Sequence, residues 1–240
     1  MNIGVIFAGG VGSRMKSKGK PKQFLEVNGK PIIVHTIDIF QKSEAIDAVV
    51  VVILDSWINE MNKLVDKFQL TKVKVVVKGG STGQLSIYNG LNAAKSTSTS
   101  EKDIVLIHDG VRPLINEKVL LDNIESVKNY GSAVTTAPAK ETFLLVSKNH
   151  EVETVVDRNK SFIAKAPQSF YLNDILSVHN DALSKGIEDS IDSSTLMGSY
   201  GKKLSIVDGP YENIKITTPD DFFMFKALYD SKENAQIFGI

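Results

Sequence analysis

The sequence predicts an α/β fold in which a mostly parallel central sheet is flanked by helices. Apolar runs rich in Val and Ile recur in the first half of the chain, at 3–7, 48–53, 73–77 and 104–107. Apolar residues lie on both faces of these runs instead of alternating with polar ones, which is typical of strands buried in a parallel sheet. Amphipathic stretches of helix length separate or follow them, at about 31–42, 56–69, 83–96 and 116–129. This alternation favours a parallel sheet covered by helices on both faces.

The second half of the chain departs from that rhythm. The run 133–136 continues the sheet, whereas 142–146 and 153–156 flank a polar turn, which predicts a two-stranded hairpin. The other expected elements are helices near 172–184 and 192–199, strands at 204–207 and 213–216, and a last helix from Pro219, since proline suits a first helical turn. We therefore expect a single domain over residues 1–240, with an inserted β-arm at about 139–160.

Composition and charge exclude several classes of protein. The 28 basic and 28 acidic side chains cancel, so no overall positive field is available to hold nucleic acid or an anionic membrane surface. The chain contains no apolar run long enough to span a bilayer and begins without the pattern of a secretion signal, so we expect a cytoplasmic protein. The absence of cysteine excludes disulfides, thiolate nucleophiles and cysteine-ligated metal centres.

A glycine-rich segment follows the first predicted strand. It reads AGGVGSRM from Ala8 to Met15, and the basic stretch KGKPKQF follows from Lys18. Glycines let backbone N–H groups approach phosphate oxygens, and Arg14 and Lys22 supply positive charge, so the segment is a candidate phosphate-binding loop. It has neither the dinucleotide-binding spacing nor the Walker ending. A tight strand-to-helix turn with solvated charges is the alternative interpretation.

A second candidate site follows the fourth predicted strand, in the segment HDGVRP that begins at His108. A carboxylate at the carboxyl end of a parallel strand points into the crevice where such sheets bind ligands. Asp109 is therefore well placed to hold Mg²⁺, a hard cation that takes carboxylate and phosphate oxygens. The alternative is that Asp109 caps the following helix and pairs with Arg112. We expect His108 to be a packed, hydrogen-bonded side chain.

The third candidate is a lysine near the carboxyl end of the chain. Lys215 lies in the segment NIKITTPDD, and alternation along a short strand points it either to the crevice or to solvent. An isolated lysine carries little information by itself. How strongly Lys215 indicates a catalytic site depends on the other segments with which it occurs.

Six segments taken together resemble one family. AGGVGSRM, PKQF, GKPIIVHT, HDGVRP, APQSF and NIKITTPDD, in this order and across essentially the whole chain, resemble the IspD-like cytidylyltransferases. That family includes methylerythritol phosphate cytidylyltransferase and the ribitol-5-phosphate cytidylyltransferases of wall and capsule synthesis. The resemblance implies a Rossmann-like nucleotidyltransferase fold and a Mg²⁺ requirement. It also implies a homodimer in which the projecting arms reach into each other's sites.

The resemblance also implies roles for individual residues. Arg14, Lys22 and Lys215 match the catalytic cations of the family, and Asp109 matches its metal-binding aspartate. Thr142 and Arg158 match residues that hold the acceptor's phosphate from the neighbouring subunit, and Arg112 is a further acceptor-binding candidate. The remaining residues expected to bind the nucleotide are Ala8, Gly9, Gly10, Gly12, Ser13, Gly80, Ser81, Gln84, Ser86 and Gly110, together with Asp109. Asp192 matches another recurrent aspartate, for which a helix cap is the expected role.

One segment departs from the family pattern. Where relatives carry an arginine after the Gly-Gly pair, this chain has Gly83, although the serine that follows is kept as Ser86. Because the loop faces base and ribose in relatives, we expect Gln84 to offer its amide donor and acceptor to a pyrimidine edge. CTP is the expected nucleotide, and another nucleotide is the alternative.

The expected reaction transfers CMP from CTP to a polyol phosphate and releases pyrophosphate. D-Ribitol 5-phosphate is the first candidate acceptor, supported by Val111 before Arg112 and by the Thr217-Thr218-Pro219 ending of the lysine segment. The alternative is the methylerythritol phosphate enzyme of isoprenoid synthesis. A nucleotide-binding module without catalysis is a third possibility. Such a module has no need of a metal-binding aspartate and a catalytic lysine together, so the presence of both argues against it.

Overall fold

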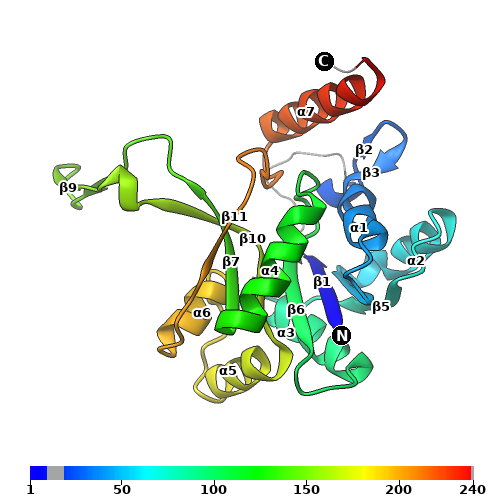
Figure 1. Ribbon diagram of the computed structural model, residues 1–240, viewed down its shortest axis with the longest axis horizontal. Coiled ribbons are helices and arrows are strands. Elements are labelled where there is room, and N and C mark those ends of the chain that lie inside the picture. The colour runs from blue at the N-terminus through cyan, green and yellow to red at the C-terminus, as the bar shows by residue number, and fades with distance from the viewer. Residues whose placement is uncertain (10–18, 239–240) are drawn as a thin grey trace.

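The computed structural model describes the backbone at residues 1–9 and 19–238, and the side chains there except at 232, 233 and 235–238. Within these ranges, seven strands form one sheet in the order β11-β7-β10-β6-β1-β4-β5 (Figure 1). Their bounds are β1 Asn2–Ala8, β4 Ala48–Ile53, β5 Val73–Lys78, β6 Ile104–Asp109, β7 Ser132–Pro138, β10 Phe162–Tyr171 and β11 Ile206–Asp208.

The sheet is mostly parallel, as the sequence predicts. β1 pairs in parallel with β4 and β6, β4 with β5, and β11 with β7. β10 alone among these strands runs antiparallel to its neighbours β6 and β7. The carboxyl ends of β1, β4 and β6 therefore meet at one edge of the sheet, where the candidate residues lie.

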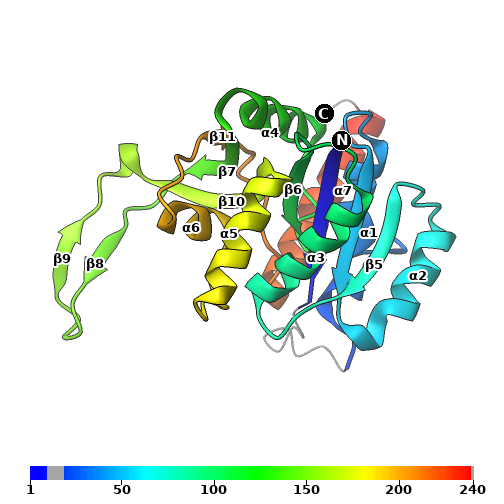
Figure 2. The ribbon, with the colours of Figure 1, turned by 90° about the horizontal axis from the view of Figure 1, so that it is seen from below.

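Helices cover both faces of the sheet (Figure 2). One apolar core joins the sheet to α1 (Ile32–Lys42), α2 (Ile58–Lys67) and α4 (Glu117–Tyr130). A second core joins the opposite face to α3 (Gly83–Thr97), α5 (Leu172–Ser184) and α6 (Ser193–Ser199). Because β4 and β6 are buried along their whole length between these layers, their sequences are apolar on both faces.

Local chemistry fixes the ends and the packing of the helices. Asn116 caps α4 by accepting from the Val119 N–H, and Gly131 ends that helix in the left-handed region with φ +82°. On the opposite face, a Cβ at Gly90 of α3 would lie 2.6 Å from Val5 and 2.7 Å from Val52. The glycine thus lets α3 pack directly on β1 and β4, the strands that lead to the site.

The predicted hairpin projects from the main body (Figure 1). It consists of β8 (Leu144–Val146) and β9 (Val152–Val155), which pair antiparallel. Every residue of both strands is exposed, although most of them are apolar. The hairpin is confirmed, and in the structure as described its apolar side chains remain about half exposed.

The remaining elements are short, apart from the last helix. α7 (Pro219–Phe238) packs through Phe225 against Ile32 and Ile216, forming a third apolar cluster. Its start at Pro219 agrees with the sequence prediction. The short elements are β2 (Glu26–Val27), β3 (Lys30–Pro31) and 3-10 turns at Lys22–Phe24, Asp55–Trp57 and Arg158–Lys160.

One expected strand is absent, and one observed strand was not expected. Residues 213–216 form no strand, because the Ile216 N–H donates to the Val111 carbonyl without continuing into a ladder. Conversely, β10 lies in the middle of the sheet but was not predicted. Lys165 and Pro167 interrupt its apolar pattern, and its register with β7 shifts between Ala164 and Gln168.

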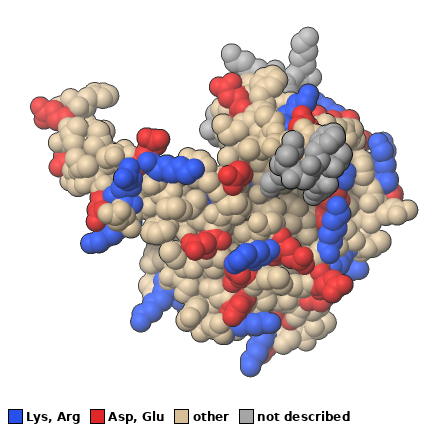
Figure 3. Space-filling model, turned by 45° about the horizontal axis from the view of Figure 1, so that its top comes forward, with Lys and Arg blue, Asp and Glu red and all other residues tan. Residues whose placement is uncertain are grey.

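The surface agrees with the balanced composition. Basic and acidic side chains are interspersed on the face shown in Figure 3, without a broad region of one sign. None of the helices in the described part of the chain is long and apolar enough to cross a membrane.

Candidate active site

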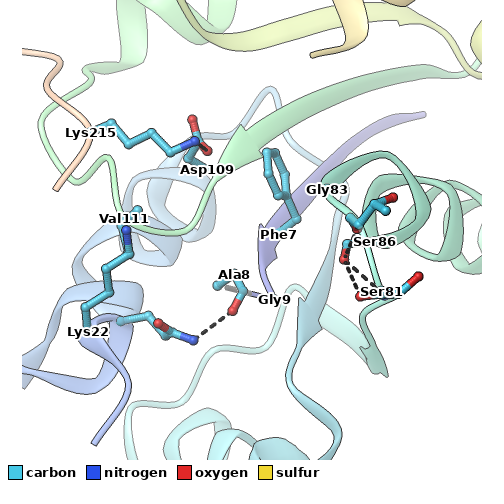
Figure 4. A pocket seen from close by; sticks show the side chains of 13 residues that line it. Phe7, Ala8, Gly9, Lys22, Ser81, Gly83, Ser86, Asp109, Val111 and Lys215 are labelled. Carbon is cyan, nitrogen blue, oxygen red and sulfur yellow. Dashed lines mark hydrogen bonds and ion pairs between the residues drawn. The ribbon is translucent and has the colours of Figure 1, made fainter. Parts of the chain in front are cut away.

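A first pocket of about 300 Å³ opens at the carboxyl ends of β1 and β6 (Figure 4). Residues from five separate segments line it. They are Phe7, Ala8 and Gly9 after β1, Lys22 and Gln23, the turn from Gly80 to Gly83 with Ser86, and Asp109, Val111 and Lys215. The pocket thus brings together three of the sequence segments singled out as candidates.

The turn before α3 has little room for side chains. A Cβ at Gly80 would lie 2.4 Å from the Leu85 side chain, so this position requires glycine. The Ser86 hydroxyl accepts from the Gly80 N–H at 3.0 Å and donates to the Thr82 carbonyl at 2.9 Å. Ser86 therefore shapes the turn from inside, and glycines leave backbone N–H groups accessible to a ligand.

Asp109 joins two cations at the end of β6. Its Oδ1 lies 2.6 Å from Lys215 Nζ, and its Oδ2 accepts from Arg112 Nε at 2.7 Å. Asp109 does not cap α4, which begins after Asn116. Of the two orientations left open for Lys215, the structure has the one that faces Asp109 (Figure 4).

These contacts set the protonation of the site. Burial by itself raises the pKa of Asp109, but the charges of Lys215 and Arg112 outweigh it and lower the pKa to about 2. Asp109 is thus ionised throughout the physiological range. Burial lowers the pKa of His108 to about 4, and its Nε2 contacts the Arg112 carbonyl at 3.1 Å, so it is the packed neutral histidine expected.

A second pocket of about 260 Å³ adjoins the first. Phe7, Gly83, Asp109 and Lys215 line both pockets, so the Asp109–Lys215 pair stands on their common wall. The side of the second pocket away from the first is formed by Ile87, Ile107, Arg112, residues 164–166, Gln168 and residues 191–193. Two adjoining pockets that share an ion pair can hold two ligands with their reacting ends together.

Comparison with known proteins places this arrangement in a family. The family model described as IspD, 2-C-methyl-D-erythritol 4-phosphate cytidylyltransferase, matches residues 3–230. The chain belongs to the IspD family of cytidylyltransferases. The family expected from the six sequence segments is therefore confirmed, and with it the assignment as a nucleotidyltransferase.

Individual relatives agree with the family. The chain is 70% identical over 240 residues to the ribitol-5-phosphate cytidylyltransferase of Streptococcus agalactiae serotype V, covering all of both chains. It is 52% identical over 239 residues to the enzyme of the same name from Vibrio parahaemolyticus, again covering all of both. It resembles the crystal structure of 4-diphosphocytidyl-2C-methyl-D-erythritol synthase from Anaerococcus prevotii, with a TM-score of 0.82 and 26% identity over 95% of this chain and 96% of that one.

Asp109 is the described carboxylate that lines both pockets, so it is the candidate ligand for the metal expected for the family. Among the described residues, no group of three His, Asp or Glu side chains lies close enough to hold a metal by itself. Asp109 is ionised and borders both pockets, so it fits a Mg²⁺ ion whose other ligands are phosphate oxygens and water. Both of its oxygens already pair with a cation, and each has a second lone pair that could ligate a metal.

Gln84 lies elsewhere than the sequence suggested. Its side chain is 2% exposed and does not line the first pocket. Its Nε2 donates to the Ile187 carbonyl at 2.7 Å, and its Oε1 accepts from the Ser190 N–H at 2.7 Å. Both ends of the amide are therefore engaged by the loop before α6, and base recognition by Gln84 is not supported by this geometry.

The loop before α6, residues 187–192, is held on both of its sides. Thr82, which caps α3, donates its hydroxyl to the Glu188 carbonyl. Gln168 on β10 donates to Asp192 at 3.1 Å, and Asp192 accepts from the Thr195 N–H at 2.7 Å as the N-cap of α6. The cap predicted for Asp192 is confirmed, and the loop forms a wall of the second pocket.

The other expected residues line one of the pockets, line neither pocket, or lie outside the described residues. Ala8, Gly9, Lys22, Gly80, Ser81, Ser86, Asp109 and Lys215 line the first pocket, and Arg112 lines the second. Gly110 lines neither pocket, and its N–H donates to the Phe7 carbonyl at 2.9 Å. Thr142 and Arg158 are exposed on the arm and line neither pocket. Gly10, Gly12, Ser13 and Arg14 lie outside the described residues.

Sequence reasoning missed several residues that form the pockets. Phe7 lies on the common wall, and Lys165 and Gln168 lie in the second pocket. Phe7 looked like a core residue at the end of an apolar run. The lysine within the short apolar run FIAKA was a signal that pointed to this strand.

Proposed function

We propose that this chain transfers CMP from CTP to D-ribitol 5-phosphate, giving CDP-ribitol and pyrophosphate. The two similar relatives that carry the name ribitol-5-phosphate cytidylyltransferase, at 70% and 52% identity over full length, support this acceptor. Methylerythritol phosphate is the alternative acceptor, because the matching family model carries that name.

One observation supports the reaction most directly. The Asp109–Lys215 pair lies on the wall that the two pockets share. We propose that the first pocket holds the nucleotide and that the second holds the acceptor. The α-phosphorus of CTP then lies at the pair, where an acceptor in the second pocket can reach it.

The proposed chemistry needs positioning and positive charge rather than a protein nucleophile. A phosphate oxygen of the acceptor attacks the α-phosphorus in line, a new P–O bond forms, and the bond to the bridging oxygen breaks as pyrophosphate leaves. Because a phosphate monoester is already anionic, no general base is required. We assign Lys215 to the charge that develops at the α-phosphate, and Lys22 and Arg14 to the triphosphate.

We also propose that the reaction requires Mg²⁺. Asp109 would hold the ion together with phosphate oxygens of the nucleotide, and the ion would neutralise part of their charge. Arg112 donates to both Asp109 and the Asn213 carbonyl, so it keeps the carboxylate in place. Loss of pyrophosphate release on addition of a chelator, with recovery on adding Mg²⁺, is the direct test.

We propose a homodimer in which the arm completes the neighbour's site. Thr142 and Arg158 are exposed on the arm, where an arginine can grip a phosphate in a bidentate fork. The apolar side chains of Leu144, Leu145 and Val155 are also at least 49% exposed, which suits an arm that packs on a second chain. Sedimentation of the full chain tests the oligomeric state.

A substrate panel decides between the candidate activities. Pyrophosphate release is measured with Mg²⁺ for CTP, UTP, ATP and GTP, each with ribitol 5-phosphate or methylerythritol 4-phosphate. We expect turnover with CTP and ribitol 5-phosphate at a kcat/KM at least about tenfold above every other pair. A preference for methylerythritol phosphate would establish the alternative, and nucleotide binding without any turnover would favour a binding module.

The proposed location is the cytoplasm, because a reaction that consumes a nucleoside triphosphate needs a compartment that supplies it. Fractionation of cells that produce the chain, with immunodetection in each fraction, tests this proposal.

A further inference from the structure

Lys165 on β10 is a buried lysine in the wall of the second pocket, and the proposed reaction assigns it no role. It is 7% exposed, and its Nζ donates to the Tyr211 carbonyl at 2.9 Å and to the Asn213 carbonyl at 3.0 Å. Within the described residues its ammonium forms no ion pair. Burial lowers the pKa of Lys165, and the nearby Arg112 lowers it further. Two of its N–H groups thus bond backbone carbonyls of one turn.

The carbonyls that Lys165 binds belong to the turn that precedes Lys215. Asn213 in this turn is fully buried, and its carbonyl accepts from Lys165 and also from Arg112 at 2.9 Å. Its Nδ2 donates to the Ala166 carbonyl at 2.7 Å, on the same bulge of β10 as Lys165. The Tyr211–Asn213 turn is thus fastened to β10 by three hydrogen bonds and to Arg112 by a fourth.

Lys215 depends on this fastening because no sheet ladder holds its backbone. On its other side the Ile216 N–H donates to the Val111 carbonyl at 3.0 Å. The Lys215 side chain is long and 43% exposed, so packing gives it little support. Its ammonium reaches Asp109 only if the backbone between Asn213 and Ile216 keeps its place.

We infer that Lys165 is a positioning residue of the transfer reaction, which acts by holding the Tyr211–Asn213 turn so that Lys215 meets Asp109. The inference rests on the proposed function, because Lys215 is the group that Lys165 serves. A displacement of about 1 Å in a catalytic group is enough to slow a reaction on the order of 100-fold. Lys165 therefore affects turnover more than nucleotide binding.

The test compares substitutions at Lys165 by steady-state pyrophosphate release with CTP and ribitol 5-phosphate. Lys165→Met keeps the side-chain length but loses the N–H donors and the charge. Lys165→Arg keeps the N–H donors and the charge. Lys140→Met is the matched control, because Lys140 lies 3.6 Å from the centre of the Tyr211 ring but is exposed.

For Lys165→Met we expect kcat to fall roughly 10- to 100-fold while the KM for CTP changes less than about threefold. Lys165→Arg should recover kcat to within about threefold of wild type, and Lys140→Met should stay within about twofold. A Lys165→Met enzyme with wild-type kcat, or a Lys165→Arg enzyme as slow as Lys165→Met, would overturn the inference.

A thermal unfolding measurement and the wild-type substrate panel distinguish a failed inference from a variant that does not fold and from a wrong proposed function. If thermal unfolding shows that Lys165→Met does not fold, Lys165→Gln replaces it, since this side chain is uncharged and one atom shorter. Equal kcat values for Lys165→Gln and Lys165→Arg would then overturn the inference. Failure of the wild type to turn over CTP with ribitol 5-phosphate contradicts the proposed function instead, and the variants are then compared with the substrate pair that the panel identifies.

Discussion

Lys215 Nζ lies 2.6 Å from Oδ1 of Asp109, on the wall that two pockets share. Asp109 comes from the end of β6, and Lys215 comes from the segment before α7. Asp109 is 8% exposed and Lys215 is 43% exposed, so the carboxylate is fixed while the lysine can follow a ligand. The pair therefore keeps a cation ready at the point where the two proposed substrates meet.

Replacing Lys215 by Ala should remove stabilisation of the transition state rather than binding of the nucleotide. We expect kcat for pyrophosphate release to fall by at least about 100-fold, in the range measured when a charge stabiliser is lost. The dissociation constant for CTP, measured by calorimetry, should rise only a few-fold. Lys128→Ala, an exposed lysine of α4, is the control and should leave both quantities unchanged. Equal losses in binding and in rate would instead assign Lys215 to uniform substrate binding.

Replacing Asp109 by Asn should give a pH-dependent loss of stability. The pKa of Asp109 is lowered from 3.8 to about 2, so its charge stabilises the fold fully above about pH 4, and this contribution is lost as the pH falls toward 2. At pH 7 we expect Asp109→Asn to lower the free energy of unfolding by roughly 1–3 kcal/mol, because two cations lose a charged partner. The difference from wild type should shrink between about pH 4 and pH 2.

Denaturant unfolding at several pH values measures this difference. Asp66→Asn, at an exposed carboxylate of α2, serves as control and should change stability by less than about 0.5 kcal/mol. A difference between wild type and Asp109→Asn that is the same at pH 7 and at pH 2.5 would argue against the ion pairs as its source.

Replacing Gln84 by Met should loosen the loop before α6 without altering base selection. The variant loses two buried hydrogen bonds, to Ile187 and Ser190, so we expect stability to fall by about 1–3 kcal/mol. The Ser190 amide should exchange its hydrogen faster, as measured by mass spectrometry. The ratio of kcat/KM for CTP over UTP should stay within about twofold of wild type. A collapse of that ratio would restore Gln84 as a base-binding residue. Asn92→Ala, on the exposed side of α3, is the matched control.

Mixed dimers test whether the arm serves a neighbour. Arg158→Ala and Lys215→Ala chains should each be nearly inactive alone. Mixed together, they should regain up to about a quarter of the wild-type activity, because one site of each hybrid dimer then contains both residues. Differently tagged chains allow the hybrids to be isolated and assayed. Isolated hybrids without activity would mean that both residues act within a single chain.

Much of the fold was readable from the sequence because its signals are local. The apolar runs that became β1, β4 and β6 are largely buried on both faces, so their composition alone marks them as strands of a parallel sheet. The run that became β5 was also expected to be buried, but β5 lies at the edge of the sheet and is only partly buried or exposed. The hairpin was equally plain, since a polar turn separates two short runs. β10 was missed because a buried lysine and a proline interrupt its pattern, and a bulge accommodates them.

A residue of the candidate site was predictable where its type and its own segment indicate its chemical role. Asp109 ends a buried strand, so its own segment indicated the site. Gly80, which has no room for a Cβ, was expected only from the resemblance to the family. Gln84 could not be placed in this way. Its amide suits a pyrimidine edge as well as it suits a loop backbone, and only the position of residues 187–190 decides between them.

The sequence by itself determined the layered α/β architecture, the family and the residue types of the site, because strand burial, turn chemistry and ordered motifs are properties of short segments. Tertiary structure decided which partners those residues have. The Lys215 ammonium pairs with Asp109 although the side chain is partly exposed, and Lys165 binds the turn that precedes Lys215. Such pairings depend on how distant segments of the chain cross in space. A hydrogen bond forms only when its two atoms lie about 3 Å apart, and the pattern of a short segment does not specify the distance to a residue elsewhere in the chain.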